Sequence, residues 1–285
     1  MLVHVLSAQV CTNGWTQELI WNQAEDQISP SQITVNMFGD IYILDDHNYS
    51  IHYFPKNGSE SNVSGGWGEE GETFIFATDL AVSGGNDVYI CDYGSSRIIR
   101  FDRKLNYISD FRTDILDIDP IFFPIKIAIN PLGEIVVVSS QQWDVSLIST
   151  MGTVLFTTGN IPFADSRFKK ISDCSVNPAT QIGVIDGGLG QCIILSRNGQ
   201  INYRISLPDD QNYFIHWWRN SWLILSQTGI LWVVKPEFVE FSEILSANRS
   251  GQTYEFIDFS IHENSIYSID QLSGKIYSTQ LRSVD

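Results

Sequence analysis

Residues 80–111 read LAVSGGNDVYICDYGSSRIIRFDRKLNYISDF, and this stretch decides the fold. It contains four short runs that are rich in β-branched and aromatic residues, the side chains that favour strands. Between the runs lie residues typical of turns, such as Gly84-Gly-Asn86 and Asp92-Tyr-Gly-Ser-Ser96. This rhythm predicts one four-stranded antiparallel sheet.

The same unit recurs along the chain. A tetrad of apolar, small, apolar and polar residues opens at four positions spaced by 47 residues, and looser copies follow after steps of 41 and 44. The six positions are Ile33, Leu80, Ile127, Cys174, Ile215 and Phe259. Units of this period bury their apolar faces only against their neighbours. They therefore predict an all-β fold, a six-bladed β-propeller with blades that start near these positions.

The sixth unit supplies only three strands, whereas Thr16-Gln-Glu-Leu-Ile-Trp21 precedes the first unit and has no place in it. Pairing this segment as the outer strand of the last blade closes the ring and removes two open sheet edges. Residues 16–285 are therefore predicted to form a single propeller domain. Residues 1–15 are an N-terminal extension or the remnant of a secretory signal that ends near Ala8.

Composition narrows the class of protein. Apolar residues make up 43% of the chain and aromatic residues 12%, which excludes a disordered polymer. The net charge is −16, so nucleic acid and anionic lipid are unfavourable partners. No apolar run reaches the ~18 residues of a membrane-spanning helix. Four cysteines stand at no metal-like spacing and are predicted to be buried free thiols: Cys11, Cys91, Cys174 and Cys192.

The second unit resembles an NHL repeat. The resemblance rests on Gly65-Gly-Trp-Gly68, Gly71-Glu-Thr-Phe74, Asp79-Leu-Ala-Val82, Val88-Tyr-Ile-Cys-Asp92 and Arg97-Ile-Ile-Arg-Phe101. It fades in the third and fifth units, where Ser139 and Ser226 replace the aspartate that follows the second strand. The family implied is that of the NHL and TolB-like six-bladed propellers. Because its members include scaffolds, receptors and some lyases or lactonases, the resemblance implies a fold and leaves the function open.

An antiparallel blade places its loops on two rims of the ring. The connection rim carries the links between blades and the turns from second to third strand, and the hairpin rim carries the other two sets of turns. This assignment predicts 19 of the 33 acidic residues on the connection rim: Asp45, Asp46, Glu69, Glu70, Glu72, Asp79, Asp92, Asp114, Asp117, Asp119, Asp144, Asp165, Asp173, Asp186, Asp209, Asp210, Glu255, Asp258 and Asp270. Only five bases join them: Lys126, Arg167, Lys169, Lys170 and Arg249.

Two interpretations of these carboxylates stay open. Asp45, Asp92, Asp186 and Asp270 recur in register after the second strand, which indicates a structural role in turns, because aspartate bonds nearby backbone. The connection rim as a whole is predicted to be an acidic docking surface that attracts a basic partner. Its candidate binding residues are the two loop tryptophans and their acidic neighbours: Trp67, Glu69, Glu70, Glu72, Trp143 and Asp144.

Few other residues are candidates for catalysis or for ligand binding. Asp45-Asp46-His47 is a tight cluster of potential ligands, and His216 stands at an inner-strand position held elsewhere by small residues. No nucleophile elbow, phosphate-binding glycine loop or paired zinc ligands appear, so no catalytic and no metal-binding residue is predicted. The lactonase-type relatives imply a cation held by Glu, Asn and Asp at inner-strand ends. Here Asn36, Asn130 and Asn177 occupy such ends without a glutamate, and calcium is the one cofactor left open.

The sequence thus predicts a non-catalytic propeller that binds another protein with a basic patch, as a scaffold or as a subunit of a larger complex. Its predicted location is extracytoplasmic: periplasmic, cell-surface or secreted. The alternative is a metal-dependent propeller hydrolase of the lactonase or lyase kind, with a cation in the central channel. Whether the protein is an enzyme is left open by the sequence, which favours a binding role.

Overall fold

The structure is a computed structural model that describes residues 15–18, 28–58, 60–114, 123–159, 167–208, 212–235, 241–245 and 253–281. Throughout these ranges every regular element is a β-strand. A search of the same ranges finds no helix with the length and apolar character needed to cross a membrane. Of the predicted features, Cys11 and the segment before Trp15 lie outside the described residues, as do Asp117, Asp119, Asp165, Asp209, Asp210 and Arg249.

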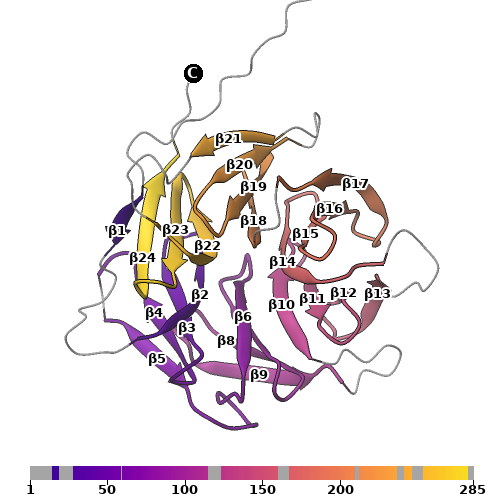
Figure 1. Ribbon diagram of the computed structural model, residues 1–285. Helices are drawn as coiled ribbons and strands as arrows, with labels where there is room; N and C mark the ends of the chain where they lie inside the picture. The colour runs from indigo at the N-terminus through magenta and orange to yellow at the C-terminus, as the bar shows by residue number, and fades with distance from the viewer. Residues whose placement is uncertain are drawn as a thin grey trace, which may run out of the picture.

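The strands form six four-stranded antiparallel sheets, which are the blades of a six-bladed β-propeller (Figure 1). Blade 1 contains β2 (Pro30–Val35), β3 (Ile41–Asp45), β4 (Ser50–Phe54) and β5 (Asn62–Gly65). Blade 2 contains β6 (Ala77–Val82), β7 (Val88–Asp92), β8 (Arg97–Phe101) and β9 (Tyr107–Arg112). Blade 3 contains β10 (Pro124–Ile129), β11 (Ile135–Ser139), β12 (Asp144–Ile148) and β13 (Val154–Thr158).

The other three blades repeat this order. Blade 4 contains β14 (Ile171–Val176), β15 (Ile182–Asp186), β16 (Gln191–Leu195) and β17 (Ile201–Ser206). Blade 5 contains β18 (Tyr213–Trp218), β19 (Ser221–Ser226), β20 (Leu231–Val234) and β21 (Phe241–Leu245). Blade 6 contains β22 (Phe256–His262), β23 (Ser265–Asp270) and β24 (Lys275–Gln280), together with β1 (Thr16–Glu18). The first strand of each blade, from β2 to β22, faces the centre of the ring in Figure 1.

Blade 6 combines strands from distant parts of the sequence. Thr16 pairs with Ser278 and Glu18 with Ile276, so β1 is the outer strand next to β24. Trp15, just before β1, is buried and packs its ring 4.6 Å from that of Phe256, so the core begins one residue before the boundary predicted at residue 16.

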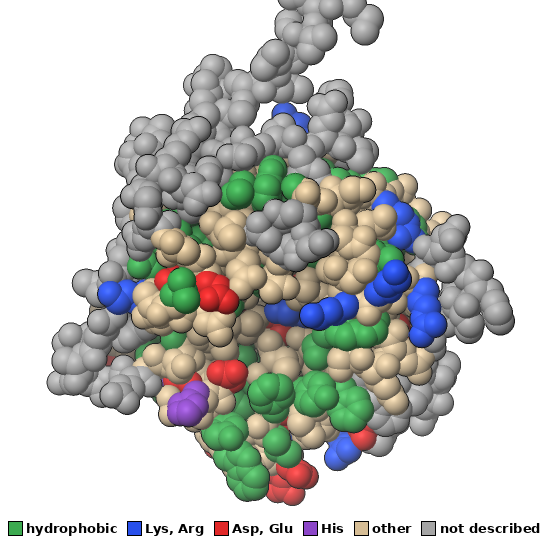
Figure 2. All heavy atoms as spheres, viewed as in Figure 1, with side chains coloured by type: hydrophobic (Ala, Val, Ile, Leu, Met, Phe, Trp, Pro, Cys, Tyr) green, Lys and Arg blue, Asp and Glu red, His purple; other side chains and the backbone are tan. Residues whose placement is uncertain are grey.

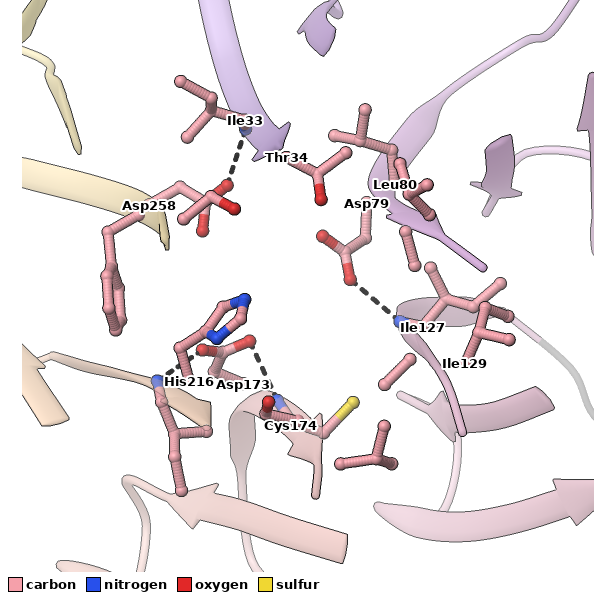
Figure 3. A pocket seen from close by; sticks show the side chains of 18 residues that line it. Ile33, Thr34, Asp79, Leu80, Ile127, Ile129, Asp173, Cys174, His216 and Asp258 are labelled. Atoms are coloured by element: carbon pink, nitrogen blue, oxygen red, sulfur yellow. Dashed lines mark hydrogen bonds between the residues drawn. The ribbon is translucent and has the colours of Figure 1, made fainter. Parts of the chain in front are cut away.

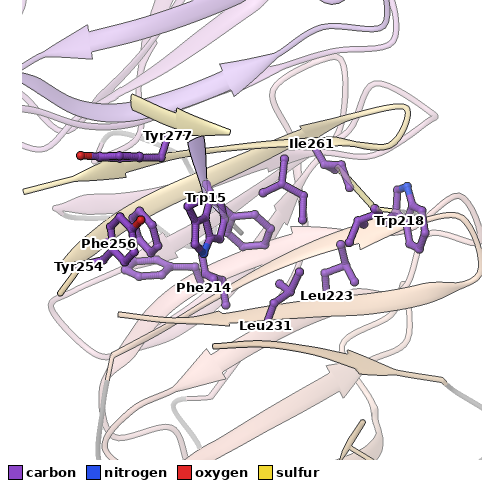
Figure 4. Packing of buried hydrophobic residues seen from close by; sticks show 13 residues of the cluster. Trp15, Phe214, Trp218, Leu223, Leu231, Tyr254, Phe256, Ile261 and Tyr277 are labelled. Carbon is purple, nitrogen blue, oxygen red and sulfur yellow. The ribbon is translucent and has the colours of Figure 1, made fainter. Parts of the chain in front are cut away.

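The core lies between neighbouring blades. Figure 4 shows the cluster that joins blades 5 and 6, where Phe214 and Leu223 from one sheet meet Phe256 and Tyr277 from the other. Comparable clusters of buried residues join blades 1 and 2 and blades 3 and 4. The three described cysteines, Cys91, Cys174 and Cys192, are buried and unpaired. Because each sheet buries both of its faces in this way, the blades form a rigid frame for the loops at either rim.

Polar contacts join the blades in an alternating pattern. Near the hairpin rim, the guanidinium of Arg103 in blade 2 donates to Asp40 of blade 1 over 2.7 Å, and that of Arg197 in blade 4 donates to Glu134 of blade 3 over 2.9 Å. Arg219 of blade 5 donates likewise to the Asn264 side chain of blade 6. Blades 2 and 3, 4 and 5, and 6 and 1 are joined near the axis by the carboxylates described below, and Lys56 and His262 also join blades 1 and 6 at the hairpin rim, 3.2 Å apart.

Candidate functional site

An ordered loop on the connection rim presents Trp67. The loop covers residues 66–76, between β5 and β6, and 71% of the Trp67 surface is exposed. Glu69, Glu70 and Glu72 follow within the same loop and are exposed too. The loop therefore displays one large aromatic side chain beside three carboxylates, which is the juxtaposition that the sequence predicted for this segment.

The loop is held by hydrogen bonds at both ends. The amide of Gly66 donates to the Tyr49 carbonyl over 2.7 Å, and that of Phe74 donates to the Gly66 carbonyl over 2.9 Å. The buried guanidinium of Arg97 donates to the Thr73 carbonyl over 2.6 Å, and the Phe74 ring below is completely buried. Because these contacts fix both stems, Trp67 and its carboxylates are presented with little freedom to lose on binding.

Aromatic side chains continue from this loop along the connection rim. The rings of Phe76 and Tyr93 meet edge-on at 5.7 Å, and Tyr93 lies 5.1 Å from Phe123. Phe76 and Phe123 each expose more than a third of their surface. We call Trp67, Phe76, Tyr93 and Phe123 the aromatic strip. Its last three members are in contact, and Trp67 lies in the same loop as Phe76 and the exposed glutamates. Sequence reasoning found only Trp67.

The other candidates from the sequence do not join this surface. Trp143 is half-buried and packs against the core between blades 3 and 4, and Asp144 beside it begins β12 half-buried. Asp46 is half-buried, and burial together with the neighbouring Asp45 raises the pKa of its carboxyl. His47 is exposed in the turn after β3. These residues lie at two separate places, the start of β12 and the turn after β3, and not in one site.

The four aspartates that follow the second strand of their blades are buried and tie the blade together. We call Asp45, Asp92, Asp186 and Asp270 the closing-turn aspartates. Asp92 accepts the amides of Ile75 and Phe76, and Asp186 accepts those of Lys169 and Lys170. Asp45 and Asp270 accept the amides of Ser29 and Glu255 in the same way. Each carboxylate thus fixes the connection that enters its own blade.

The acidic connection rim predicted from the sequence needs a correction. Of the 19 acidic residues assigned to it, seven are buried: Asp45, Asp79, Asp92, Asp173, Asp186, Asp258 and Asp270. The exposed side chains Arg167, Lys169 and Lys170 lie just before β14. Figure 2 shows basic side chains gathered over β12 to β17, whereas acidic ones lie mainly on the half of this rim nearer β2, β3 and β22. The exposed charge is therefore divided between two sectors.

Five of the inner strands carry a β-bulge at the same repeat position. The register of β2, β6, β10, β14 and β22 shifts by one residue just before Gln32, Asp79, Lys126, Asp173 and Asp258. A bulge changes the direction of the side chain that follows it. Here the side chains that follow the bulges are polar and lie near the axis. β18 has no such shift, and Phe214 stands at the equivalent position in the core.

Three of these residues, Asp79, Asp173 and Asp258, are the shaft aspartates. Each uses one carboxylate oxygen to accept a backbone amide from the next blade: Ile127 over 2.8 Å, Ile215 over 2.7 Å and Ile33 over 2.7 Å, respectively. The Lys126 ammonium lies among them, 2.8 Å from Gln32 Oε1, 3.5 Å from Asp79 Oδ1 and 4.0 Å from Asp173 Oδ1. The sequence assigned Lys126 and these aspartates to the surface of the connection rim, which is wrong, because the bulges turn them into the ring.

The electrostatics of the shaft follow from burial. Burial raises the pKa of all three shaft aspartates, against the Lys126 charge, and that of Asp173 reaches about 7. The pKa of the Lys126 ammonium is raised, because the attraction of the three carboxylates outweighs the opposing effect of its own burial. Three buried carboxyl groups therefore share one fixed cation, and ionising all of them is unfavourable.

A central cavity of about 180 Å³ begins at the shaft aspartates and runs along the inner strands (Figure 3). Its wall carries the hydroxyls of Thr34, Ser175 and Ser260, the small side chains of Ala81 and Ala128, and the imidazole of His216. His216 is half-buried, one ring nitrogen lies 2.9 Å from the Trp217 carbonyl oxygen, and burial lowers its pKa. The imidazole is therefore neutral near pH 7.

The shaft does not fit a metal ion of the kind that lactonase-type propellers imply. Asn36 and Asn130 use their side chains to cap the turns at the hairpin rim, with Asp40 and Glu134 as partners, and Asn177 caps a turn with Gln181. Among the described residues, no three His, Cys, Asp or Glu side chains are grouped closely enough to hold a metal. The Lys126 ammonium already lies where a cation bound by these carboxylates would be placed.

Comparison with known proteins bears on the fold. A scan against protein-family models found no match, and a search of curated protein sequences found none either. Among solved structures the chain is similar to a streptogramin B lyase, with a TM-score of 0.68 and 12% identity over 94% of this chain and 98% of the other. It is also similar to an inactive virginiamycin B lyase from Staphylococcus aureus with quinupristin, with a TM-score of 0.65 and 12% identity over 94% and 99%.

A third similar structure is hydrazine synthase from Kuenenia stuttgartiensis, with a TM-score of 0.66 and 10% identity over 91% of this chain and 79% of the other. At such identities the likeness shows a shared six-bladed propeller fold and carries no activity over to this chain. The fold therefore places this protein in the class of six-bladed β-propellers.

Proposed function

We propose that this propeller is a non-catalytic binding module, whose partner is a protein with a basic patch. The observation that supports this most is the loop 66–76, which displays Trp67 beside Glu69, Glu70 and Glu72 on a stem fixed by Arg97. Aromatic side chains surrounded by charge often dominate the affinity of protein interfaces. The aromatic strip would supply the buried contact area, and the glutamates would favour association with a basic surface.

The division of the connection rim refines this proposal. Arg167, Lys169 and Lys170 are exposed just before β14, so a uniformly basic partner would be repelled there. We infer that the partner contacts the sector of blades 1 and 2 rather than the whole rim. A place in a larger extracytoplasmic complex, and a distant relation to the NHL-repeat propellers, are part of the same proposal.

The test uses a ten-residue oligolysine peptide as a defined basic probe. Binding is expected to weaken between about 50 and about 300 mM salt, because surface charges are screened. The double variant E69K/E70K is expected to lose the interaction. The matched control E60K/E263K reverses two exposed glutamates at the hairpin rim and is expected to retain it.

The second arm of the test compares the proteins that co-purify with the wild type, W67A, E69K/E70K and E60K/E263K. A partner bound through the proposed surface is retained by the control and lost by the other two variants. A partner that all four proteins retain, at low and at high salt, would refute the acidic-aromatic surface as the site of binding.

A second candidate function is the propeller lyase or hydrolase that depends on a metal ion, because two of the similar structures carry lyase names. The donor set described above does not support it, so no catalytic step is derived. Titration with calcium, magnesium and zinc under a thermal-shift readout tests it directly. A saturable rise in melting temperature that a chelator reverses would favour this candidate over the binding module.

A further inference from the structure

The wall of the central cavity carries polar atoms that make no hydrogen bond to other described residues. Ser175 is only 8% exposed and lines the cavity, yet its hydroxyl makes no hydrogen bond to any other described residue. Asp258 is also 8% exposed, and only one of its carboxylate oxygens accepts a hydrogen bond, from the Ile33 amide. Both groups face the cavity, where their polar atoms are open to a hydrogen-bonding ligand.

The charge of the shaft indicates what kind of partner that is. Three carboxylates face one ammonium, and Lys126 is not among the residues that line the cavity. Asp79 and Asp173 engage both of their oxygens with backbone amides and Lys126, whereas Asp258 keeps one oxygen free to accept a hydrogen bond on the cavity side. Lys126 itself shows that an ammonium group fits this environment, since its Nζ lies within 4.0 Å of Gln32, Asp79 and Asp173. An ammonium satisfies its three donors with carboxylate, amide or hydroxyl oxygens.

The remaining wall limits the rest of the ligand. Ala81 and Ala128 leave room beside the axis, and apolar side chains such as Ile127 and Ile129 close the wall around them. An apolar cavity of about 150 Å³ holds a benzene molecule, so about 180 Å³ accommodates a body of about six to eight non-hydrogen atoms. A divalent metal would need several ligands at short, fixed distances, which the shaft does not provide.

We propose that the central cavity binds a small protonated primary amine, with its ammonium group at the shaft aspartates and its body directed toward the hairpin rim. Asp258 and the Ser175 hydroxyl accept hydrogen bonds from the ammonium, and Ser260 and His216 border the body of the ligand. The site is separate from the aromatic strip. The proposal of an amine site is therefore tested independently of the proposed protein partner.

The experiment compares n-pentylamine, which is protonated at pH 7.5, with n-pentanol, its neutral analogue of the same size, by titration calorimetry and thermal shift. The amine is expected to bind saturably and to raise the melting temperature of the wild-type protein. Pentanol and equal concentrations of sodium chloride are expected to leave it unchanged. Equal effects of amine and alcohol would overturn the proposal without any variant.

Variants locate the site. S175A removes one acceptor and is expected to weaken amine binding about fivefold, and D258N about 10- to 100-fold, because hydrogen bonds to charged groups are the stronger ones. The controls S109A and E60Q change exposed residues outside the cavity and are expected to bind like the wild type. E69K/E70K is expected to keep amine binding. Unchanged affinity in folded S175A and D258N would contradict a site in the cavity.

Discussion

The closing-turn aspartates and the shaft aspartates are buried to a similar degree, yet they connect different parts of the molecule. A closing-turn aspartate ties two segments of one blade and uses both oxygens, as Asp92 does for Ile75 and Phe76 and Asp186 for Lys169 and Lys170. A shaft aspartate ties two blades through one oxygen, and its other oxygen faces Lys126, its own strand or the cavity.

The shaft aspartates show that hydrogen bonds from backbone amides do not by themselves keep a buried carboxyl in its charged form. Hydrogen bonds from backbone amides favour the charged form, whereas burial opposes it. In the shaft, burial outweighs the amide hydrogen bonds, which for Asp173 come from Ile215 and Cys174, and the pKa values are raised. Four predictions test this contrast, from the largest expected effect on stability to the smallest.

Removing a closing-turn aspartate is expected to cost the most. In Asp92→Ala, the amides of Ile75 and Phe76 lose their acceptor, and the buried Arg97 loses a carboxylate 3.7 Å away. Breaking a buried charge pair costs about 3–5 kcal/mol. Urea denaturation should show a loss in this range, against no change for the exposed control Glu60→Ala. A loss below about 1 kcal/mol would mean that the turn does not depend on the carboxylate.

Removing the fixed cation of the shaft is the second test. Lys126→Met leaves the shaft aspartates without their counter-charge, and a loss of about 3 kcal/mol is expected at pH 8. The loss should shrink at pH 5.5, because the carboxyls then take up protons. Denaturation at both pH values measures it, with the exposed Lys169→Met as control. A loss that does not change with pH would show that Lys126 acts through packing.

The third prediction concerns pH. The pKa of Asp173 is about 7 in the folded protein, above the value of about 4 for an unfolded chain. Between these values the folded state holds a proton that the unfolded state releases, so stability falls as pH rises through 7. Going from pH 8 to pH 6.5, the Asp173 carboxyl should therefore contribute about 0.8 kcal/mol of stability.

His216, whose pKa burial lowers, opposes this trend near pH 6.5 because its imidazole begins to charge in the unfolded chain. This contribution is the same in the wild type and in Asp173→Asn, so the difference between the two proteins isolates Asp173. Asp173→Asn should flatten the dependence, and melting curves at closely spaced pH values compare the two proteins. An identical slope in both would assign the effect to another group.

The smallest effect on stability is expected from exposed carboxylates. Glu69→Lys with Glu70→Lys should change the free energy of unfolding by less than about 0.5 kcal/mol, because both side chains are in solvent. Thermal melting of this variant beside the wild type measures the change. A large destabilisation would mean that these glutamates support the fold, and the loss of a partner in this variant could then no longer be assigned to binding.

The sequence predicted the frame of the molecule closely. The 47-residue spacing located the blades, and strands such as Val88–Asp92 and Arg97–Phe101 begin and end where turn residues indicated. The structural role given to the closing-turn aspartates was visible because they recur in register. These features depend on local patterns that repeat, which is the information that a single sequence carries best.

The shaft was not predicted, although a signal for it was present. Gln32, Asp79, Lys126 and Asp173 share the same 47-residue spacing and precede each tetrad by one residue. Whether such residues face solvent or the axis depends on the bulge that shifts each inner strand, and a bulge leaves no clear mark in composition. Simple rim counting therefore placed buried carboxylates on the surface and made the rim too acidic.

The alternation of contacts between blades bears on how the molecule arose. Carboxylates near the axis join blades 2 and 3, 4 and 5, and 6 and 1, whereas charged and amide side chains near the hairpin rim join the intervening pairs, with one further contact from Lys56 to His262 between blades 1 and 6. The shaft carboxylates therefore repeat every two sheets, not every one. A gene that grew by copying single sheets would leave like seams side by side. This architecture favours an ancestor that was duplicated as a two-sheet module, and it suggests that any future shortening or lengthening would succeed in even steps.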